Sequence, residues 1–330
     1  MKKRVWSLVR DLKVTVSPTA LFLFCAFSGG LFSCATNPAS SPRSLTDTQK
    51  NKLREFEAEL ELGRNMASRL LATSEPLPNK KVVDYINDVG LYIARYSDAP
   101  ERKYMFEVLN DNTVNAFACP GGYIFVTAGA LRMAENEAEL AAILGHEIAH
   151  VSNQHMLKAI KGKDFKTVAD KEKELTPKGD GSTDTQIQAR MRPEPPQSEL
   201  GRMMSQYLMG PGGAGLSLFA AVDAGMGILL KEGLDQKLEF EADRVGTRIA
   251  IKAGYEPQAL IHYFSRMQAE KQSQKALTQS LEKTHPKTAE RKDHLTKYLA
   301  LEKKDSATGA GGKERFDKIK ALLLANNDTH

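Results

Sequence analysis

The segment HEIAH places two histidines, His146 and His150, four residues apart, with Glu147 directly after the first. On an α-helix these two positions share one face, so both imidazole rings can approach a common point. Zinc in a hydrolytic site takes three protein ligands and keeps one position for water, which the neighbouring glutamate can reach as a general base. The segment therefore predicts part of a zinc hydrolase site, with His146 and His150 as ligands and Glu147 as the base.

The surrounding helix agrees with this prediction. Its apolar stripe is formed by Leu140, Leu144, Ile148 and Val151, and the two histidines lie on a different face. They are therefore not part of the main apolar stripe. A second interpretation stays open at this point, in which the helix carries two polar histidines and binds no metal.

A third ligand is expected on another helix, and the segment EFEAD at residues 239–243 offers one. There Leu238, Ala242, Val245 and Ile249 form an apolar stripe, while Glu239 and Asp243 stand four residues apart. One carboxylate on a metal and a second that accepts the free N–H of a ligand histidine form a common arrangement. The alternative interpretation is a solvated acidic patch.

Composition limits the class of protein. The chain has 330 residues, of which 41% are hydrophobic and 26% charged, and these values are typical of globular proteins. Much of the net charge of +5 comes from basic residues near the N-terminus, so no dense basic face for nucleic acid is predicted. The 3 cysteines cannot form a disulfide framework if Cys25 leaves with a signal peptide and Cys34 carries lipid. Cys119 is then expected to be a small buried residue.

The N-terminus has the features of an export signal. A basic start is followed by an apolar run and then by Leu31-Phe32-Ser33-Cys34, which resembles a bacterial lipobox. We expect a lipoprotein signal peptide at residues 1–33, lipidation of Cys34 and a tether at 34–46. Ala35 favours the outer membrane as the destination. An ordinary cleaved signal, which would release the protein into the soluble periplasm, and a retained membrane anchor are the alternatives.

The remaining pattern predicts a mostly helical α+β fold with a small sheet. Strands are expected at 104–110 and 123–127, with a turn at 120–122. The polar stretch at 161–200 is interpreted as a flexible surface insertion. The apolar stretch at 203–230 is interpreted as a core helix, and the alternative is a surface that faces a substrate or a membrane. The apolar stripe of the first helix is expected to contain Leu53, Phe56, Leu60, Met66 and Leu70. Helices are expected at 47–73, 82–96, 137–160, 236–253, 257–274 and 288–301, followed by a C-terminal linker and short helix at 302–330.

Four segments in order resemble the HtpX, BepA and CAAX-prenyl-protease type of gluzincin zinc metallopeptidase, and the resemblance spans about residues 53–295. The segments are Asn115-Ala116-Phe117-Ala118 up to Gly121-Gly122, LGHEIAHV, EFEADRVG, and His285-Pro286 followed by Arg291. The resemblance implies a zincin-like domain at 47–301 with one Zn²⁺ per chain. It implies that Glu239, rather than Glu241, is the third ligand, and that Asp243 supports the ligands without binding the metal. It also implies an endopeptidase acting on unfolded or misassembled envelope proteins.

Two further residues enter through the resemblance. It implies that His285 approaches the metal, as a ligand at rest or as a group that steadies the oxyanion, whereas a helix-capping loop is the alternative. Arg291 is expected to stabilise developing negative charge or to donate a structural salt bridge. We expect the substrate backbone to pair with the edge strand at Asn115, Ala116, Phe117 and Ala118. His155, His262, His294 and His330 are interpreted as surface or packing residues without a ligand partner.

The sequence departs from the family pattern in three places. It has no multi-span hydrophobic architecture, no tetratricopeptide-like array after Leu301, and an insertion at 161–200 without a counterpart. Two other hypotheses therefore stay open. One is a chaperone-like outer-membrane assembly factor with a gated or mostly silent zinc site, and the other is a structural metalloprotein with four permanent ligands.

Overall fold

The structure is a computed structural model, and it describes residues 45–162, 218–273, 275–285, 287–302 and 312–325. The chain divides into two compact units, Met1–Lys52 and Leu53–His330. Of the first unit, the structure describes the beginning of helix α2 (Asp47–Thr73). The predicted signal peptide, Cys34, most of the tether and nearly all of the insertion lie outside the described residues. The predicted chemistry therefore lies in the second unit.

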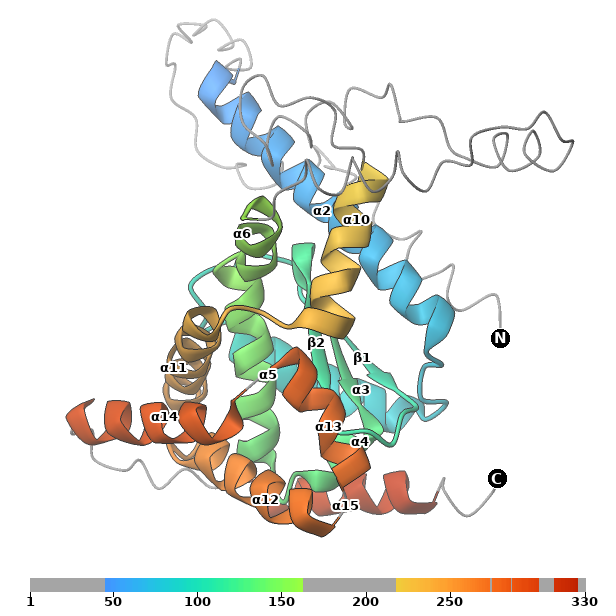
Figure 1. The fold of residues 1–330 in the computed structure, drawn as a ribbon, viewed down its shortest axis with the longest axis vertical. Helices are drawn as coiled ribbons and strands as arrows, with labels where there is room; N and C mark the ends of the chain where they lie inside the picture. Colours follow the sequence, from blue (N-terminus) through green and yellow to red (C-terminus); the bar gives the residue numbers. More distant parts are fainter. Residues whose placement is uncertain (1–44, 163–217, 274, 286, 303–311, 326–330) are drawn as a thin grey trace, which may run out of the picture. The chain divides into compact units, whose positions relative to one another are not determined.

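A three-stranded sheet forms the centre of the fold (Figure 1). Its strands are β1 (Met105–Leu109), β2 (Ala116–Cys119) and β3 (Tyr123–Thr127), in the order β1-β3-β2. β1 pairs with β3 in parallel, and β2 pairs with β3 antiparallel through the turn η1 (Pro120–Gly122). Gly122 has a φ of 102°, and a Cβ there would lie 2.2 Å from the carbonyl oxygen of Lys103, so this turn requires glycine.

Both faces of the sheet are buried, because alternate residues of each strand point to opposite sides. Ile124 and Val126 join an apolar cluster with α3 (Lys80–Ala94), α5 (Glu137–Ser152), α11 (Gln236–Lys252) and α12 (Ala259–Ser273). Tyr123 and Phe125 join a second cluster with α2, α6 (His155–Lys161), α10 (Leu218–Gly227) and η2 (Ile228–Glu232). The sheet is thus the middle layer of an α+β fold, as predicted.

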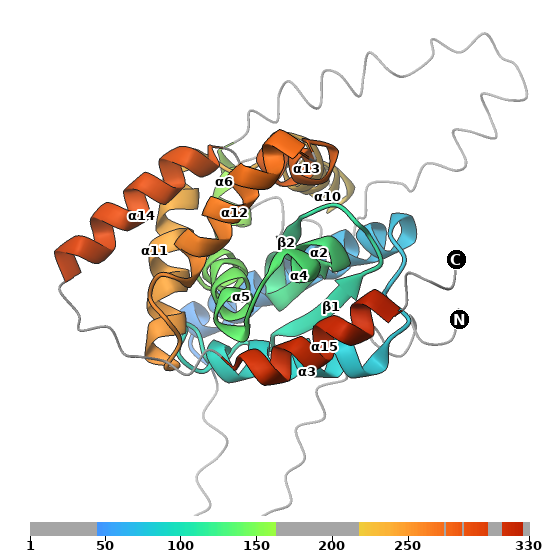
Figure 2. The ribbon, with the colours of Figure 1, turned by 90° about the horizontal axis from the view of Figure 1, so that it is seen from below.

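Helix α5 lies at the core of the domain (Figures 1 and 2) and is buried along nearly its whole length, from Glu137 to Val151. Asn136 caps its N-terminus, since the Asn136 Oδ1 atom accepts a hydrogen bond of 2.9 Å from the Glu139 amide. Helix α11 packs along it, and α12 and α3 also contact it. Every polar side chain on α5 therefore needs a buried partner.

The C-terminal helix α15 (Lys313–Ala325) packs on the same core. Figure 2 shows it beside α3, with α4 (Ala128–Met133) and α5 behind. Phe316 is 1% exposed, and the Arg315 guanidinium donates to both carboxylate oxygens of Glu137, at 3.1 and 2.7 Å. Tyr85 and Tyr255 donate to the same carboxylate. A helix distant in sequence is therefore tied to the first turn of α5.

Most predicted elements are confirmed, with small shifts at their ends, whereas two predictions are wrong and two helices were not predicted. The helix expected at 137–160 is two helices, because Gln154 adopts a left-handed φ of 54° between α5 and α6. Two helices, α4 and α13 (Lys275–Thr284), were not expected. In α2, Leu53 and Phe56 are 47% and 39% exposed, and the buried stripe instead follows Leu62, Met66 and Leu70.

The described part of the apolar stretch 203–230 supports its interpretation as a core helix. Ala221, Val222 and Leu229 are buried in the second cluster. Among the described residues, no helix combines the length and apolar character that a membrane span requires.

Candidate metal centre

Two glycines let the predicted ligand helices α5 and α11 come into close contact. A Cβ on Gly246 would lie 2.5 Å from the backbone nitrogen of His146, and a Cβ on Gly145 would lie 2.7 Å from the carbonyl oxygen of Gly246. Any side chain at either position would push the backbones apart. The close approach brings the first turns of α11, which carry Glu239 and Asp243, against the histidines of α5.

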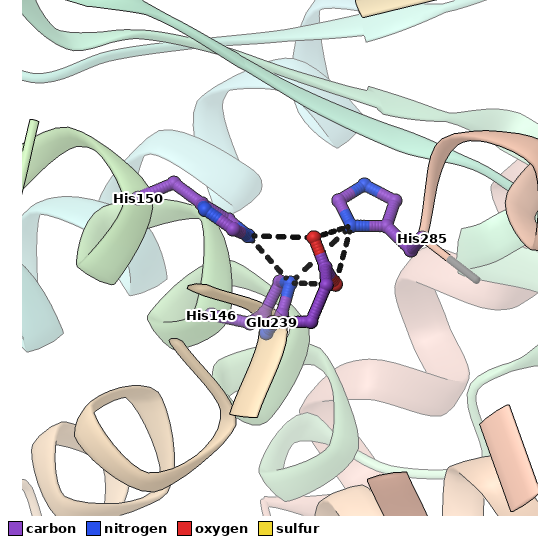
Figure 3. Close-up of side chains that lie close together, drawn as sticks. All are labelled: His146, His150, Glu239 and His285. Carbon is purple, nitrogen blue, oxygen red and sulfur yellow. Dashed lines mark hydrogen bonds and ion pairs between the residues drawn. The ribbon is translucent and has the colours of Figure 1, made fainter. Parts of the chain in front are cut away.

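Four buried side chains, His146, His150, Glu239 and His285, meet at one point (Figure 3). Each offers one ligand atom, and these atoms all lie within 4.8 Å of one another. The Glu239 carboxylate is the common neighbour, at 3.5 Å from the Nε2 atoms of His146 and His150 and 3.0 Å from Nδ1 of His285. The interpretation of Glu239 and Asp243 as a solvated patch is wrong, because both are 0% exposed.

The protonation pattern of the two α5 histidines fits a cation. Nδ1 of His146 lies 2.9 Å from the Asp243 carboxylate and therefore carries a hydrogen. Burial lowers the pKa of this ring, but its contacts with Asp243 and Glu239 outweigh burial and raise the pKa to about 9, so a bound cation would take the place of the hydrogen on Nε2. Nδ1 of His150 is likewise occupied, by a contact of 2.9 Å with Nδ1 of His155. The two Nε2 atoms stand 2.9 Å apart, and with both rings neutral and protonated on Nδ1 they present lone pairs to the same space. Imidazole and carboxylate donors in this arrangement suit zinc among divalent ions.

Arg291 of α14 (Thr288–Glu302) holds the carboxylates. Its Nε and Nη2 atoms donate to the two oxygens of Asp243 at 2.9 and 2.6 Å, and its Nη1 atom lies 3.1 Å from Glu239. The guanidinium also stacks over the Phe264 ring at 4.7 Å. The guanidinium is thus directed at Asp243 and Glu239.

These charges determine the ionisation of the acids. Burial alone raises the pKa of Glu239, but attraction to His285 and Arg291 outweighs it and holds the pKa well below its usual value. Burial likewise raises the pKa of Asp243, and its pairing with Arg291 again lowers it overall. Both carboxylates are therefore ionised at neutral pH.

Glu147 differs from these two acids. It is 2% exposed, its Oε2 atom has no hydrogen-bond partner within the described residues, and its Oε1 atom lies 3.9 Å from Nε2 of His285. Burial raises its pKa. A carboxylate with one free oxygen and a raised pKa beside the cluster is able to exchange a proton with a bound molecule.

Glu147 and His285 line two pockets that are otherwise mainly apolar. Phe117, Ile228 and Leu229 are among the residues lining one of them, with an empty volume of about 280 Å³. The other has about 350 Å³ and is lined by Ile143, Leu260 and Phe264 among others. A molecule that reaches Glu147 can therefore place apolar groups in either pocket.

The predicted substrate strand lies at one edge of the sheet, as β2. Asn115 precedes it, and its Oδ1 atom accepts hydrogen bonds from the Ala116 amide at 2.9 Å and from the Thr284 hydroxyl at 3.0 Å. Nε2 of His285 lies 3.4 Å from the carbonyl oxygen of Ala116, and η2 also packs against β2. In this structure the end of α13 therefore lies across the beginning of the strand.

One residue near the cluster, His155, was not predicted from the sequence. His155 was expected to have no ligand partner, but it is 0% exposed and touches His150. Its position at the start of a second helix was hidden by the prediction of one continuous helix. The His294 ring stacks on Phe240 at a centroid distance of 4.2 Å, as expected of a packing residue, and the His262 side chain is 47% exposed. Cys119 is buried and free, and His330 lies outside the described residues.

Comparisons with known proteins find relatives that match 60–65% of the chain. The chain is 26% identical over 203 residues to the beta-barrel assembly-enhancing protease of Escherichia coli strain K12, covering 60% of this chain and 35% of that protein. It is 26% identical over 202 residues to the putative beta-barrel assembly-enhancing protease of Vibrio cholerae, covering 60% and 36%. It is 27% identical over 216 residues to the mitochondrial metalloendopeptidase OMA1 of Schizosaccharomyces pombe, covering 65% and 52%. The chain thus spans little more than a third of the bacterial relatives.

Residues 80–299 match the family described as peptidase family M48. This stretch contains all four residues of the cluster together with Glu147, Asp243 and Arg291. Because the match covers more than half of the chain, and the buried cluster lies within it, the protein belongs to peptidase family M48.

Proposed function

We propose that the protein is a zinc-dependent endopeptidase with one zinc ion per chain. His146, His150 and Glu239 would hold the ion, because their donor atoms converge and their other polar atoms are already engaged. When bound, zinc supplies a Lewis acid that polarises a peptide carbonyl and makes water a better nucleophile. The observation that carries the proposal is the free carboxylate oxygen of Glu147 beside this cluster.

In this proposal Glu147 performs the proton transfers. It accepts a proton from the attacking water and delivers it to the amine nitrogen as the peptide bond breaks. Burial raises its pKa, which makes the carboxylate a stronger base toward the water proton. Asp243 and Arg291 act on the ligands and not on the substrate, since their polar atoms face His146 and Glu239.

The substrate is proposed to be an extended, unfolded chain. An edge strand recognises backbone and not a particular sequence, so Asn115–Ala118 could pair with any extended segment once the end of α13 moves aside. The two apolar pockets beside Glu147 suit the apolar side chains that unfolded proteins expose. The relatives named as assembly-enhancing proteases support misassembled envelope proteins as this substrate class.

The export signal at the N-terminus supports an envelope location and supplies the anchor. In this proposal residues 1–33 are a lipoprotein signal peptide, Cys34 is the lipidated residue and residues 34–46 form the tether. The peptidase domain follows at 47–301 and contains the insertion at 161–200. The C-terminal linker and helix occupy residues 302–330. The protein would then face the periplasm from the outer membrane. Metabolic labelling with palmitate tests the anchor, because a Cys34→Ala variant should lose the label.

The test of the activity compares the protein starting at residue 35 with its Glu147→Gln variant. We expect the variant to bind zinc as tightly as wild type and to cleave casein at least about 100-fold more slowly. Glu135→Gln is the matched control, because that side chain is 61% exposed and pairs with Arg266 away from the cluster. Cleavage by Glu147→Gln at the wild-type rate would refute the assignment of the base.

A second candidate is a chaperone-like assembly factor with a gated or mostly silent site. It is favoured by His285, whose Nδ1 atom lies 3.0 Å from Glu239 and whose side chain lines both pockets. If His285→Ala raises casein cleavage, the protein is a gated peptidase, whereas no cleavage by any variant supports binding as its activity. A structural metal site is distinguished by its failure to bind a hydroxamate, which requires an accessible ion.

A further inference from the structure

We propose that His155 is a positioning residue for the metal centre: its Nδ1 atom accepts the N–H of His150 and thereby directs the opposite nitrogen of His150 toward the ion. The contact between the two Nδ1 atoms is 2.9 Å, and both rings are buried. The inference rests on the metal site of the proposed function, but it does not depend on peptidase activity.

The backbone places His155 there through a break between two helices. Helix α5 ends at Ser152, and α6 begins at His155 after Gln154 has turned the chain with a left-handed φ of 54°. This turn returns a residue five positions after His150 to the side of its ring. An uninterrupted helix would carry position 155 away from this face.

A buried carboxylate fixes the turn. The Gln154 amide donates a hydrogen bond of 2.8 Å to Glu59, which is itself 2% exposed. Glu59 is also paired with Arg102 and accepts a hydrogen bond of 3.2 Å from the Gly121 amide. The strained conformation of Gln154 is therefore stabilised from α2 and from the turn between β2 and β3.

The direction of the hydrogen bond follows from the chemistry of imidazole. A neutral ring carries one hydrogen, so a His150 that presents the Nε2 lone pair to a metal must carry its hydrogen on Nδ1. His155 then accepts at Nδ1 and carries its own hydrogen on Nε2. That nitrogen has no hydrogen-bond partner within the described residues, but it lies 3.6 Å from the Glu241 carboxylate, which accepts a hydrogen bond of 3.0 Å from Asn153.

The two ligand histidines are thus held by different groups. Asp243 holds the ring of His146 and is charged, whereas a neutral imidazole would hold His150. Removing the partner of a ligand histidine typically lowers metal affinity about 10–100-fold. A residue that only fills space would not have this effect, provided that its volume is kept.

The experiment compares His155→Asn with His155→Leu. The two side chains have nearly the same shape, but Asn can place an acceptor oxygen where Nδ1 stands and Leu cannot. The zinc dissociation constant is measured by competition with a chromophoric chelator, and unfolding of the metal-free proteins in urea is measured in parallel. We expect His155→Leu to bind zinc about 10–100-fold more weakly than wild type, and His155→Asn to recover most of this loss.

A second readout is the tautomer of His150, from the ¹⁵N chemical shifts of its ring in the zinc-loaded protein. We expect the hydrogen on Nδ1 in wild type and in His155→Asn. Equal zinc affinities for the Leu variant and wild type would overturn the inference, as would equal losses in the Leu and Asn variants. If wild type binds no zinc, the proposed metal site fails as well, so the two failures are distinguishable.

Discussion

Replacing Arg291 with methionine removes the guanidinium that pairs with both Asp243 and Glu239, and we expect the metal-free protein to lose about 3–5 kcal/mol of stability. Both carboxylates are 0% exposed, so neither can be hydrated in the folded protein after the substitution. Methionine keeps much of the side-chain length and can still pack on Phe264. The loss would therefore come from unpaired charge and not from a cavity.

The expected change is large enough to measure directly. For a domain of this size, about 3–5 kcal/mol corresponds to a fall of roughly 6–20 °C in the midpoint of thermal unfolding. Bound zinc should recover part of the loss, because it supplies positive charge beside Glu239. Arg291→Lys keeps the charge but not the forked contact with Asp243, so a smaller loss is expected.

The dependence on pH gives an independent check. Arg291 lowers the pKa values of Asp243 and Glu239. In wild type these ion pairs therefore contribute fully to the free energy of unfolding above the ordinary carboxyl pKa of about 4, and this contribution is lost as the pH falls below that value. The methionine variant should show a flatter acid dependence. If it unfolds within about 1 kcal/mol of wild type at pH 7 and loses only its cleavage rate, Arg291 acts on the substrate and its proposed pairing role is wrong.

Three further perturbations test the fold around the site. Gly246→Ala adds a methyl group 2.5 Å from the His146 nitrogen and should weaken zinc binding at least about 10-fold. Gly162→Ala is the control, because its nearest contact is at 3.5 Å and zinc binding should not change. Equal zinc affinities of the two variants would contradict the close approach of α5 and α11. Burial and the hydrogen bond to Glu137 raise the pKa of Tyr85, so the free energy of unfolding should fall as the pH rises above about 10. Tyr85→Phe should reduce this dependence on pH, measured by urea unfolding. An unchanged dependence would contradict the contact. Phe316→Ala should cost about 3–5 kcal/mol in the same assay, and a cost below about 1 kcal/mol would show that α15 is not part of the core.

The parts of the site that depend on helical spacing could be predicted from the sequence. His146 and His150 share a helix face whatever surrounds them, and Glu239 and Asp243 do so on a second helix. The sheet strands were also predictable, because their apolar residues are bounded by a turn that needs glycine. These features follow from local geometry alone.

The contacts that depend on a bend in the chain could not be predicted. Nothing in the pattern of residues 137–160 indicates the left-handed conformation of Gln154, because the carboxylate that accepts its hydrogen bond belongs to Glu59, which is distant in sequence. The partner of His150 was missed for this reason. The partners of Arg291 were likewise undetermined, since a guanidinium at that position could equally face a substrate.

The central claim is that His146, His150 and Glu239 hold a single zinc ion, and anomalous diffraction at the zinc edge tests it most directly. Crystals of the zinc-loaded protein should show one strong anomalous peak per chain within coordination distance of both α5 histidines and the Glu239 carboxylate. A peak elsewhere on the chain, or none at these side chains in protein that retains zinc, would contradict the claim.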